Sequence, residues 1–242
     1  MDVLLLFGRS GRADLGVTEI ATELGITKAA VHRILTALRN RDLIAFEPAT
    51  RRYTLGHAAI ALGRAYMART DLRIMAAPEL RRLGSLTGET TTLSIRRGDT
   101  RMYVDQVVPE HELRVEVTLG VPYPLYAGSS SKVILAYLDK QDIDDYLRKQ
   151  ELVAFTEATI TSRTALRTEL AAIRKRGYAV SMGERQLGAA SIAAPILDHD
   201  GGVMAAISVC APLSRFEPRI DEFVPLLLKA GRAISAQLGY AG

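Results

Sequence analysis

The 242-residue chain has a single cysteine, Cys210, no tryptophan and only four histidines. One thiol allows neither an intramolecular disulfide nor a multi-cysteine metal site, and it fits a reducing cytoplasm. His32, His57, His111 and His199 lie in separate segments without paired ligand spacing, so we expect no metal and no cofactor. No apolar run approaches the roughly 20 residues that cross a bilayer. These shortages predict a cytoplasmic protein without a membrane partner.

The net charge is small but unevenly distributed. The formal net charge is +4, and hydrophobic residues make up 48% of the chain, enough for one large domain or two smaller ones. Residues 1–70 contain ten Lys and Arg against six Asp and Glu, whereas the remainder contains 21 of each kind. A basic N-terminal segment on a neutral body is typical of a nucleic-acid-binding module.

Two short helices around a tight turn are predicted within the first 40 residues. The first begins at Val17 or Thr18 and ends before Gly25, which suits a helix C-cap. The second follows Thr27, a candidate N-cap, and carries apolar residues at the i, i+3, i+4, i+7 spacing of a buried face. These residues are Val31, Ile34, Leu35 and Leu38.

A short hairpin with a basic tip follows the helices. Residues 43–46 and 53–55 are β-prone, and they flank the turn "EPATRR". A helix that reads DNA buries one face and presents the other to base edges and phosphates, while a basic hairpin suits phosphates or a minor groove. The candidate DNA contacts are Thr18, Thr27, Lys28, Ala29, His32, Arg33, Thr36, Arg51 and Arg52. An ordinary surface helix with solvated charges is the alternative.

The rest of the chain predicts a mixed domain. An Ala-rich helix over 57–69 forms a connector, and a second helix follows that Pro78 divides or restarts and that ends at Gly84 or Gly88. Beyond it the predicted strands and helices are joined in part by hairpins, which indicates an antiparallel-rich α+β domain. We expect strands at 90–97, 101–108, 113–119, 191–198 and 203–211, and helices around 130–138, 142–149, 164–176 and 218–238.

A resemblance to a known family covers nearly the whole chain. The run "GVTEIATELGITKAAVHRILTALRNRDLIAFEPATRRYTLGHAAIALG" resembles the winged helix-turn-helix of IclR-family bacterial transcriptional regulators. Collinear blocks from "LTGETTTLSIRRGDTRMYVDQV" to "SIAAPILDHDGGVMAAISVCAPLSR" are similar to that family's effector-binding domain. The resemblance implies a two-domain α+β chain: a DNA-binding domain over 1–56, a helical linker over 57–76, and a GAF-like domain for effector binding and oligomerisation over 77–242.

The resemblance also implies a small-molecule pocket in the second domain. "YAGSSSKVILAYL" places small residues before an apolar helix, and a helix N-terminus presents free N–H groups to an anion. Ser129 and Ser130 fall where family members hold their ligand with main-chain amides, and Glu184 lies in a loop that the family uses near its effector. Polar candidates on later segments complete the set. These are Ser181, Ser191, Ser208 and Cys210, which suit a carboxylate or a hydroxylated molecule if all four point inward.

Three alternatives remain at this point. Ser129 and Lys132 form an S-x-x-K pattern typical of serine acyl-transfer enzymes, although the companion SDN and KTG motifs are absent. A metal sensor and a scaffold that binds only proteins are the others. We predict no enzyme but an effector-responsive regulator, more often a repressor than an activator in this family. It binds a pseudo-palindromic double-stranded operator as a homodimer or a dimer of dimers.

Overall fold

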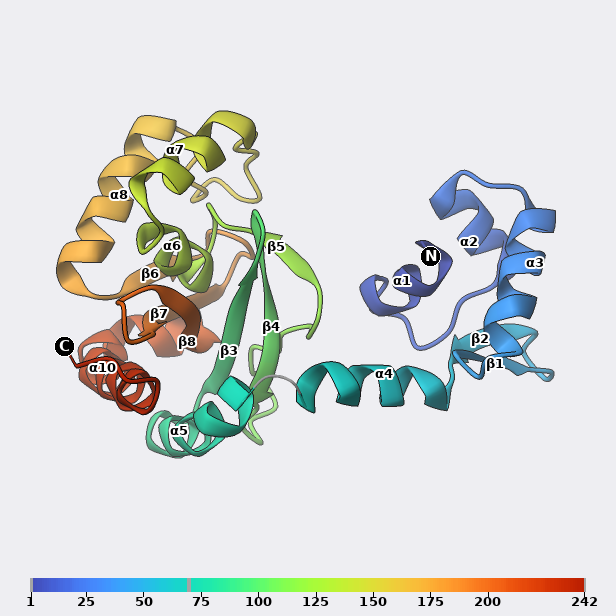
Figure 1. Cartoon of the computed structure of the whole chain (residues 1–242), viewed down its shortest axis with the longest axis horizontal. Helices are drawn as coiled ribbons and strands as arrows, with labels where there is room; N and C mark the ends of the chain where they lie inside the picture. Colours follow the sequence, from blue (N-terminus) through green and yellow to red (C-terminus); the bar gives the residue numbers. More distant parts are fainter. Residues whose placement is uncertain (1, 69–70, 242) are drawn as a thin grey trace. The chain divides into compact units, whose positions relative to one another are not determined.

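The computed structural model describes residues 2–68 and 71–241, in two compact units that divide between Asp71 and Leu72 (Figure 1). The division falls within the expected linker, 57–76. There the chain forms two helices, α4 (His57–Ala68) and α5 (Asp71–Thr87). The predicted Ala-rich connector is therefore helical through Ala68; its residue 69 lies outside the described residues.

The N-terminal unit is a winged helix-turn-helix. Helices α1 (Asp2–Arg9), α2 (Val17–Leu24) and α3 (Lys28–Arg39) precede a two-stranded antiparallel hairpin of β1 (Ile44–Glu47) and β2 (Arg52–Leu55). All three helices and both strands contribute side chains to one apolar core.

The boundaries of α2 and α3 follow from their caps. Glu19 accepts the Gly16 N–H, which would otherwise lack a partner at the start of α2. Gly25 ends α2 in the left-handed region with φ 64°, a conformation that suits glycine. The hydroxyl of Thr27 accepts the N–H of Ala30, as an N-cap residue does. These three caps fix the turn between the two helices.

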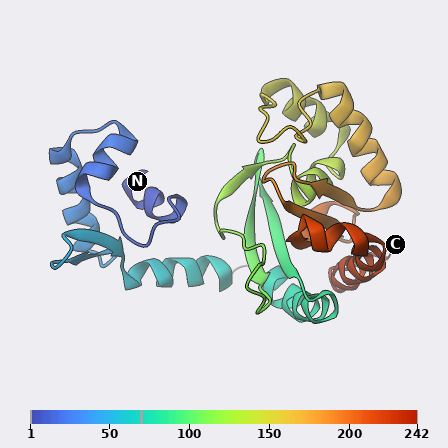
Figure 2. The same cartoon turned by 180° about the vertical axis from the view of Figure 1, so that it is seen from behind.

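The C-terminal unit is built on a six-stranded antiparallel sheet in the order β5-β4-β3-β8-β7-β6. One side packs against α5 and α10 (Ile220–Gln237), and the other packs against α6 (Ser129–Ala136), α7 (Lys140–Lys149) and α8 (Arg163–Arg176) (Figures 1 and 2). The strands are β3 (Thr90–Arg97), β4 (Thr100–Val107), β5 (Pro122–Pro124), β6 (Ala179–Met182), β7 (Ala189–Leu197) and β8 (Val203–Pro212). Short helices α9 (Leu213–Phe216) and η1 (Glu217–Arg219) join β8 to α10.

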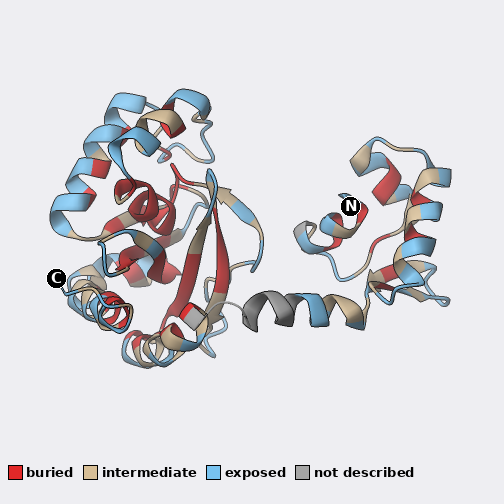
Figure 3. Ribbon diagram, viewed as in Figure 1, coloured by how far each residue is buried: buried red, intermediate tan, exposed pale blue. Residues whose placement is uncertain are grey.

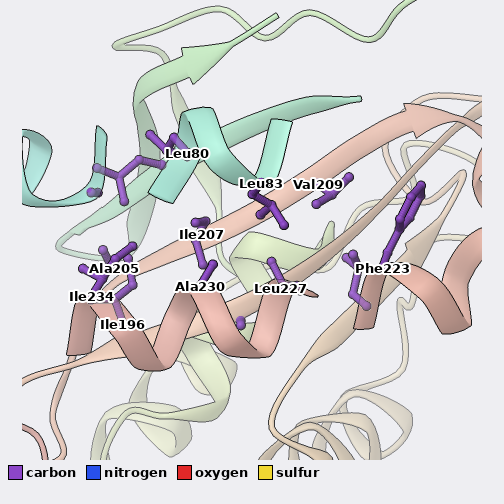
Figure 4. Packing of buried hydrophobic residues seen from close by; sticks show 14 of the residues in the cluster. Leu80, Leu83, Ile196, Ala205, Ile207, Val209, Phe223, Leu227, Ala230 and Ile234 are labelled. Carbon is purple, nitrogen blue, oxygen red and sulfur yellow. The ribbon is translucent and has the colours of Figure 1, made fainter. Parts of the chain in front are cut away.

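Side-chain alternation gives the two faces of this sheet different characters. Ile192 on β7 and Ile207 and Val209 on β8 belong to the core beneath α5 and α10. Figure 4 shows the labelled Leu80 and Leu83 of α5 and Leu227 and Ala230 of α10 around β8. The intervening Ala193 and Ala206 belong to the core beneath α6 and α8. Polar residues of β7 and β8 that alternate with the residues packed under α5 and α10 therefore lie on the face toward α6, where a cavity lies.

Two expectations about the elements are wrong. Pro78 neither divides nor restarts the helix, because α5 is continuous from Asp71 to Thr87. Proline removes one helical hydrogen bond, to the carbonyl of Ile74, and this residue is 70% exposed, so water can replace the lost donor. Residues 113–119 form no strand, despite their alternating valines, and make only one isolated bridge, between Leu119 and Tyr103.

The absence of a strand at 113–119 has a local cause. The side-chain amide of Gln106 donates to the Val117 carbonyl and accepts its N–H, both at 3.0 Å, and the Thr90 hydroxyl donates to the Val115 carbonyl. Side chains thus form the backbone hydrogen bonds that pairing with a neighbouring β-strand would otherwise supply. Two short strands that the sequence pattern did not predict, β5 and β6, form the edges of the sheet instead.

Candidate DNA interface and effector cavity

Helix α3 presents a continuous polar face to solvent. Lys28, Ala29, His32, Arg33 and Thr36 are all exposed, whereas Val31 and Leu35 on the opposite face are completely buried (Figure 3). The Thr36 hydroxyl donates to the His32 carbonyl one turn earlier. Among the described residues, no carboxylate pairs with Lys28 or Arg33. Their charges are available to a partner.

The two threonines of the predicted contact set differ in their surroundings. Thr18 is exposed in the first turn of α2, and its hydroxyl makes no hydrogen bond to a described residue. Thr27 is exposed as well, but its hydroxyl already caps α3. Thr27 therefore has a structural function whatever else it contacts.

The two arginines at the hairpin have different environments. Arg51 is exposed at the tip, with a φ of 56° that few residues other than glycine adopt. Arg52 instead turns toward the body of the unit, where its guanidinium pairs with Asp14 at 2.6 Å and Glu19 at 2.7 Å. Arg52 thus fastens the hairpin to α2, and we leave it out of the proposed DNA contacts.

A cavity of about 220 Å³ opens on the α6 side of the sheet. Strand register places Ser181, Ser191 and Cys210 side by side in one row across β6, β7 and β8. All three line the cavity, as does Ser129 at the start of α6. Residues 115–118, from the segment fastened by Gln106 and Thr90, form another wall.

The start of α6 faces this cavity through a glycine. Gly128 is the N-cap of α6 and has a φ of 89°, and its N–H donates to the Glu184 carboxylate at 3.0 Å. The Ser129 hydroxyl lies 2.7 Å from the hydroxyl of Ser191. Free N–H groups in the first turn and two hydroxyls therefore form a site suited to an anion.

Three predicted effector residues do not line the cavity. Ser208 is completely buried, and its hydroxyl lies 2.6 Å from that of Thr92. Ser130 is buried within α6. Glu184 is buried and forms an ion pair with Lys132, and its carboxylate accepts the Gly128 N–H. It therefore stabilises the loop at Gly128 without lining the cavity. Ser208 therefore stays an effector-binding prediction from the sequence, and in this structure its hydroxyl is already paired with Thr92.

The cavity also contains two arginines that sequence reasoning missed, so its lining is not made of small neutral donors alone. Arg101 on β4 is 1% exposed and donates to the hydroxyls of Ser131, Ser94 and Tyr103. Arg185 follows Glu184 in the loop after β6, and its guanidinium lies 3.8 Å from the ring centre of Tyr123. A signal for Arg101 was present, because "RMYV" alternates Arg and Tyr with apolar residues.

Burial and charge set the ionisation of the cavity groups. Burial raises the pKa of the Cys210 thiol, an effect that the Ser208 hydrogen bond and the charges of Arg101 and Arg185 oppose. Burial also lowers the pKa of Arg101, and Arg185 acts in the same direction. The thiol is therefore neutral at physiological pH, and the cavity surrounds a cation without a matching anion.

The geometry at Ser129 and Lys132 does not suit acyl transfer. The Lys132 ammonium donates to the Val180 carbonyl at 2.8 Å and pairs with Glu184, and Glu169 lies 3.6 Å away. A lysine that activates a serine must lie beside it with its amine neutral, whereas Ser129 bonds to Ser191. An ammonium between two carboxylates is not a base.

The described residues contain no group of three or more His, Cys, Asp and Glu side chains that could hold a metal ion. In the same part of the chain, no helix is both long and apolar enough to cross a membrane.

The sequence matches two models of known protein families. Residues 1–48 match the IclR helix-turn-helix domain, and residues 64–236 match the bacterial transcriptional regulator IclR C-terminal domain. Together the two matches cover both units.

Curated relatives and solved structures agree with these matches. The chain is 33% identical to the HTH-type transcriptional regulator KdgR of Escherichia coli over 94% of this chain and 87% of that one. It is 29% identical to the Escherichia coli transcriptional repressor IclR, over 99% and 88% of the two chains. A crystal structure of a regulator from Alicyclobacillus acidocaldarius superimposes with a TM-score of 0.86 at 30% identity, covering 98% of this chain and 96% of the other.

Proposed function

Since this chain belongs to the IclR family of bacterial DNA-binding transcriptional regulators, we propose that it represses its target genes and that a small organic acid controls its hold on the operator. Repression is the choice because a full-length relative is named a transcriptional repressor. The proposal places the protein in the cytoplasm, where its DNA is. Its relatives are regulators, so no catalytic step is invoked.

The polar face of α3 carries the DNA-binding half of the proposal. Lys28 and Arg33 are exposed cations on a helix whose opposite face is buried, which is the arrangement a major-groove helix requires. We assign base-edge contacts to His32, Arg33 and Thr36, and phosphate contacts to Lys28 and Arg51. Thr18, Thr27 and Ala29 stand beside them at the helix starts.

A single copy of this unit reaches few base pairs. We therefore propose a homodimer, or a dimer of dimers, on a pseudo-palindromic operator, with two copies of α3 in successive major grooves. The C-terminal unit supplies the subunit contacts in this scheme, and α4 connects it to the DNA-binding unit.

The effector-binding half rests on the cavity beside α6. Arg101, the N-terminus of α6 and the Ser129 hydroxyl all favour an anion, so we assign a small carboxylate, aliphatic or aromatic, to this site. Ser181, Ser191 and Cys210 line the same cavity. The effector acts on DNA affinity only if it binds one arrangement of the dimer more tightly than the other.

Fluorescence anisotropy with DNA from upstream of the gene and its neighbours, over a range of salt, tests both halves. We expect Arg33→Ala to weaken specific binding by roughly 5- to 150-fold, which corresponds to a base contact of about 1–3 kcal/mol. Arg51→Ala should lower the salt slope by about 0.9 per protomer. Arg97→Ala removes an exposed arginine of the other unit and is the matched control.

The same titration with a panel of small carboxylic and aromatic acids identifies the effector class. One acid should shift the operator affinity while leaving weak binding to unrelated DNA unchanged. Equal binding of wild type and Arg33→Ala to every DNA would refute the α3 assignment, and an operator complex that no acid shifts would refute the carboxylate.

A further inference from the structure

The cavity beside α6 carries more positive charge than one carboxylate can neutralise. Arg101 and Arg185 both line it, and no carboxylate of the described residues lies within 4.0 Å of either guanidinium. The acceptors of Arg101 are the neutral hydroxyls of Ser94, Tyr103 and Ser131. A buried charge with only neutral partners is costly, unless a ligand supplies the opposite charge.

The neighbouring charges cancel among themselves. Lys132 pairs with Glu184, and Glu169 behind them pairs with Arg176 at 2.8 Å. Glu116, the acidic residue on the cavity wall, is exposed and lies 3.8 Å from Arg114. Since the Cys210 thiol is neutral, the two arginines leave the cavity with two uncompensated positive charges.

These two charges lie at different depths. Arg101 comes from β4 and is 1% exposed, so it lies at the bottom of the cavity. Arg185 comes from the loop after β6, is partly exposed, and lies at the rim. The ring of Tyr123 lies against both guanidiniums, with centroid distances of 5.0 Å to Arg101 and 3.8 Å to Arg185.

The Arg185 side chain packs between the start of α6 and the ring of Tyr123. Its side chain crosses Gly128, where an added Cβ would come within 3.0 Å of the Arg185 Cδ. The glycine thus leaves room for the arginine at the start of α6, and the Tyr123 ring makes a cation–π contact with the guanidinium.

We propose that the cavity selects a small dicarboxylate, with one carboxylate on Arg101 and the α6 N-terminus and the other on Arg185. This proposal rests on the proposed function and specifies its ligand. The cavity volume of about 220 Å³ lies below the roughly 300–1,000 Å³ typical of sites for larger ligands, so we choose a short chain of about four to six carbons. The second carboxylate, at the rim, distinguishes this ligand from a monocarboxylate.

Calorimetric titration of the full-length protein tests the proposal with matched pairs of ligands. Succinate, glutarate and adipate are each compared with their monomethyl ester, which keeps the chain but removes one charge. We expect the best diacid to bind at least tenfold more tightly than its half-ester, about 1.4 kcal/mol. Inorganic phosphate is the additional probe, because it carries its two charges on one group.

Substitutions at the rim identify the residue responsible. Arg185→Met should lower diacid affinity at least tenfold and change half-ester affinity less than twofold, and Arg185→Lys should restore most of the difference because it restores the charge. Arg97→Met removes an exposed arginine that does not line the cavity, and it should change neither affinity.

The outcomes distinguish a failure of the dicarboxylate proposal from a failure of the proposed function. Equal binding of diacids and half-esters would overturn the dicarboxylate and leave the carboxylate-responsive regulator standing. An equal loss of both affinities in Arg185→Met would also overturn it, as would tight binding of phosphate in place of every diacid. If no acid of either kind binds, both the dicarboxylate and the carboxylate effector fall.

Discussion

The buried ion pair of Lys132 and Glu184 should be the most sensitive point of the C-terminal unit outside its apolar core. The two side chains are 2% and 8% exposed. Lys132→Met keeps the length of the side chain but leaves the Glu184 carboxylate buried with the Gly128 N–H as its one hydrogen-bond partner among the described residues. Removing one member of a buried pair costs about 3–5 kcal/mol, and this remaining hydrogen bond favours the lower end, about 3 kcal/mol.

Hydrogen exchange read by mass spectrometry measures this loss. A chain of two compact units need not unfold in one step, so amides of β7 and β8 report the C-terminal unit by itself. A loss of about 3 kcal/mol should speed their exchange roughly a hundredfold. Lys175→Met, an exposed lysine on α8, is the control and should change it little.

A double variant decides whether the unpaired charge is the cause. Lys132→Met with Glu184→Gln removes both charges and keeps an oxygen for the Gly128 N–H. It should recover most of the lost stability, since buried pairs can be replaced by neutral groups at little cost. The reasoning fails if the single variant loses less than about 1 kcal/mol, or if the double variant is as unstable as the single one.

Three further predictions concern other parts of the chain. Hydrogen bonds from the Gly16 N–H and then from Arg52 lower the pKa of Glu19 below its ordinary value of 4.5. The ionised Glu19 therefore stabilises the N-terminal unit above pH 4.5, and this contribution is lost as the pH falls through the lower pKa of the folded state. Amide exchange in α2 should speed up over this pH range in the wild type and should change less in Glu19→Gln. Iodoacetamide should modify Cys210 slowly in the folded protein at neutral pH, because burial raises its pKa, and faster in urea; equal rates would place the thiol outside the cavity. Arg215→Met should destabilise the C-terminal unit by about 2 kcal/mol, because Glu89, 2% exposed, loses both of its hydrogen bonds from Arg215. Unchanged exchange of the β7 and β8 amides would contradict this pairing.

Local signals in the sequence were sufficient for the DNA-binding unit. Gly25 and Thr27 each act through the backbone within a few residues of themselves, so they predict the end of α2 and the start of α3 without knowledge of the rest. The spacing of Val31 and Leu35 likewise predicts which face of α3 is buried. These interactions join residues that are close in the sequence, so the sequence pattern is enough to predict them.

Tertiary structure decided the segments whose partners lie far along the chain. Residues 113–119 have a strand pattern, but the Gln106 side chain takes their backbone groups. Arg52 reads as a cation at the hairpin tip, but Asp14 and Glu19 already neutralise it. Neither outcome depends on local propensity, so neither was predictable from it.

The sequence by itself determined the two-unit organisation, the helix caps and the small polar residues Ser129, Ser181, Ser191 and Cys210 of the cavity, because periodicity and capping act over short distances. The register of β6, β7 and β8, which brings Ser181, Ser191 and Cys210 into one row, was decided only in the folded sheet. So was the meeting of Arg101 with Arg185, which are 84 positions apart in the chain. Strand pairing and loop packing join such residues, and these depend on the fold of the whole unit.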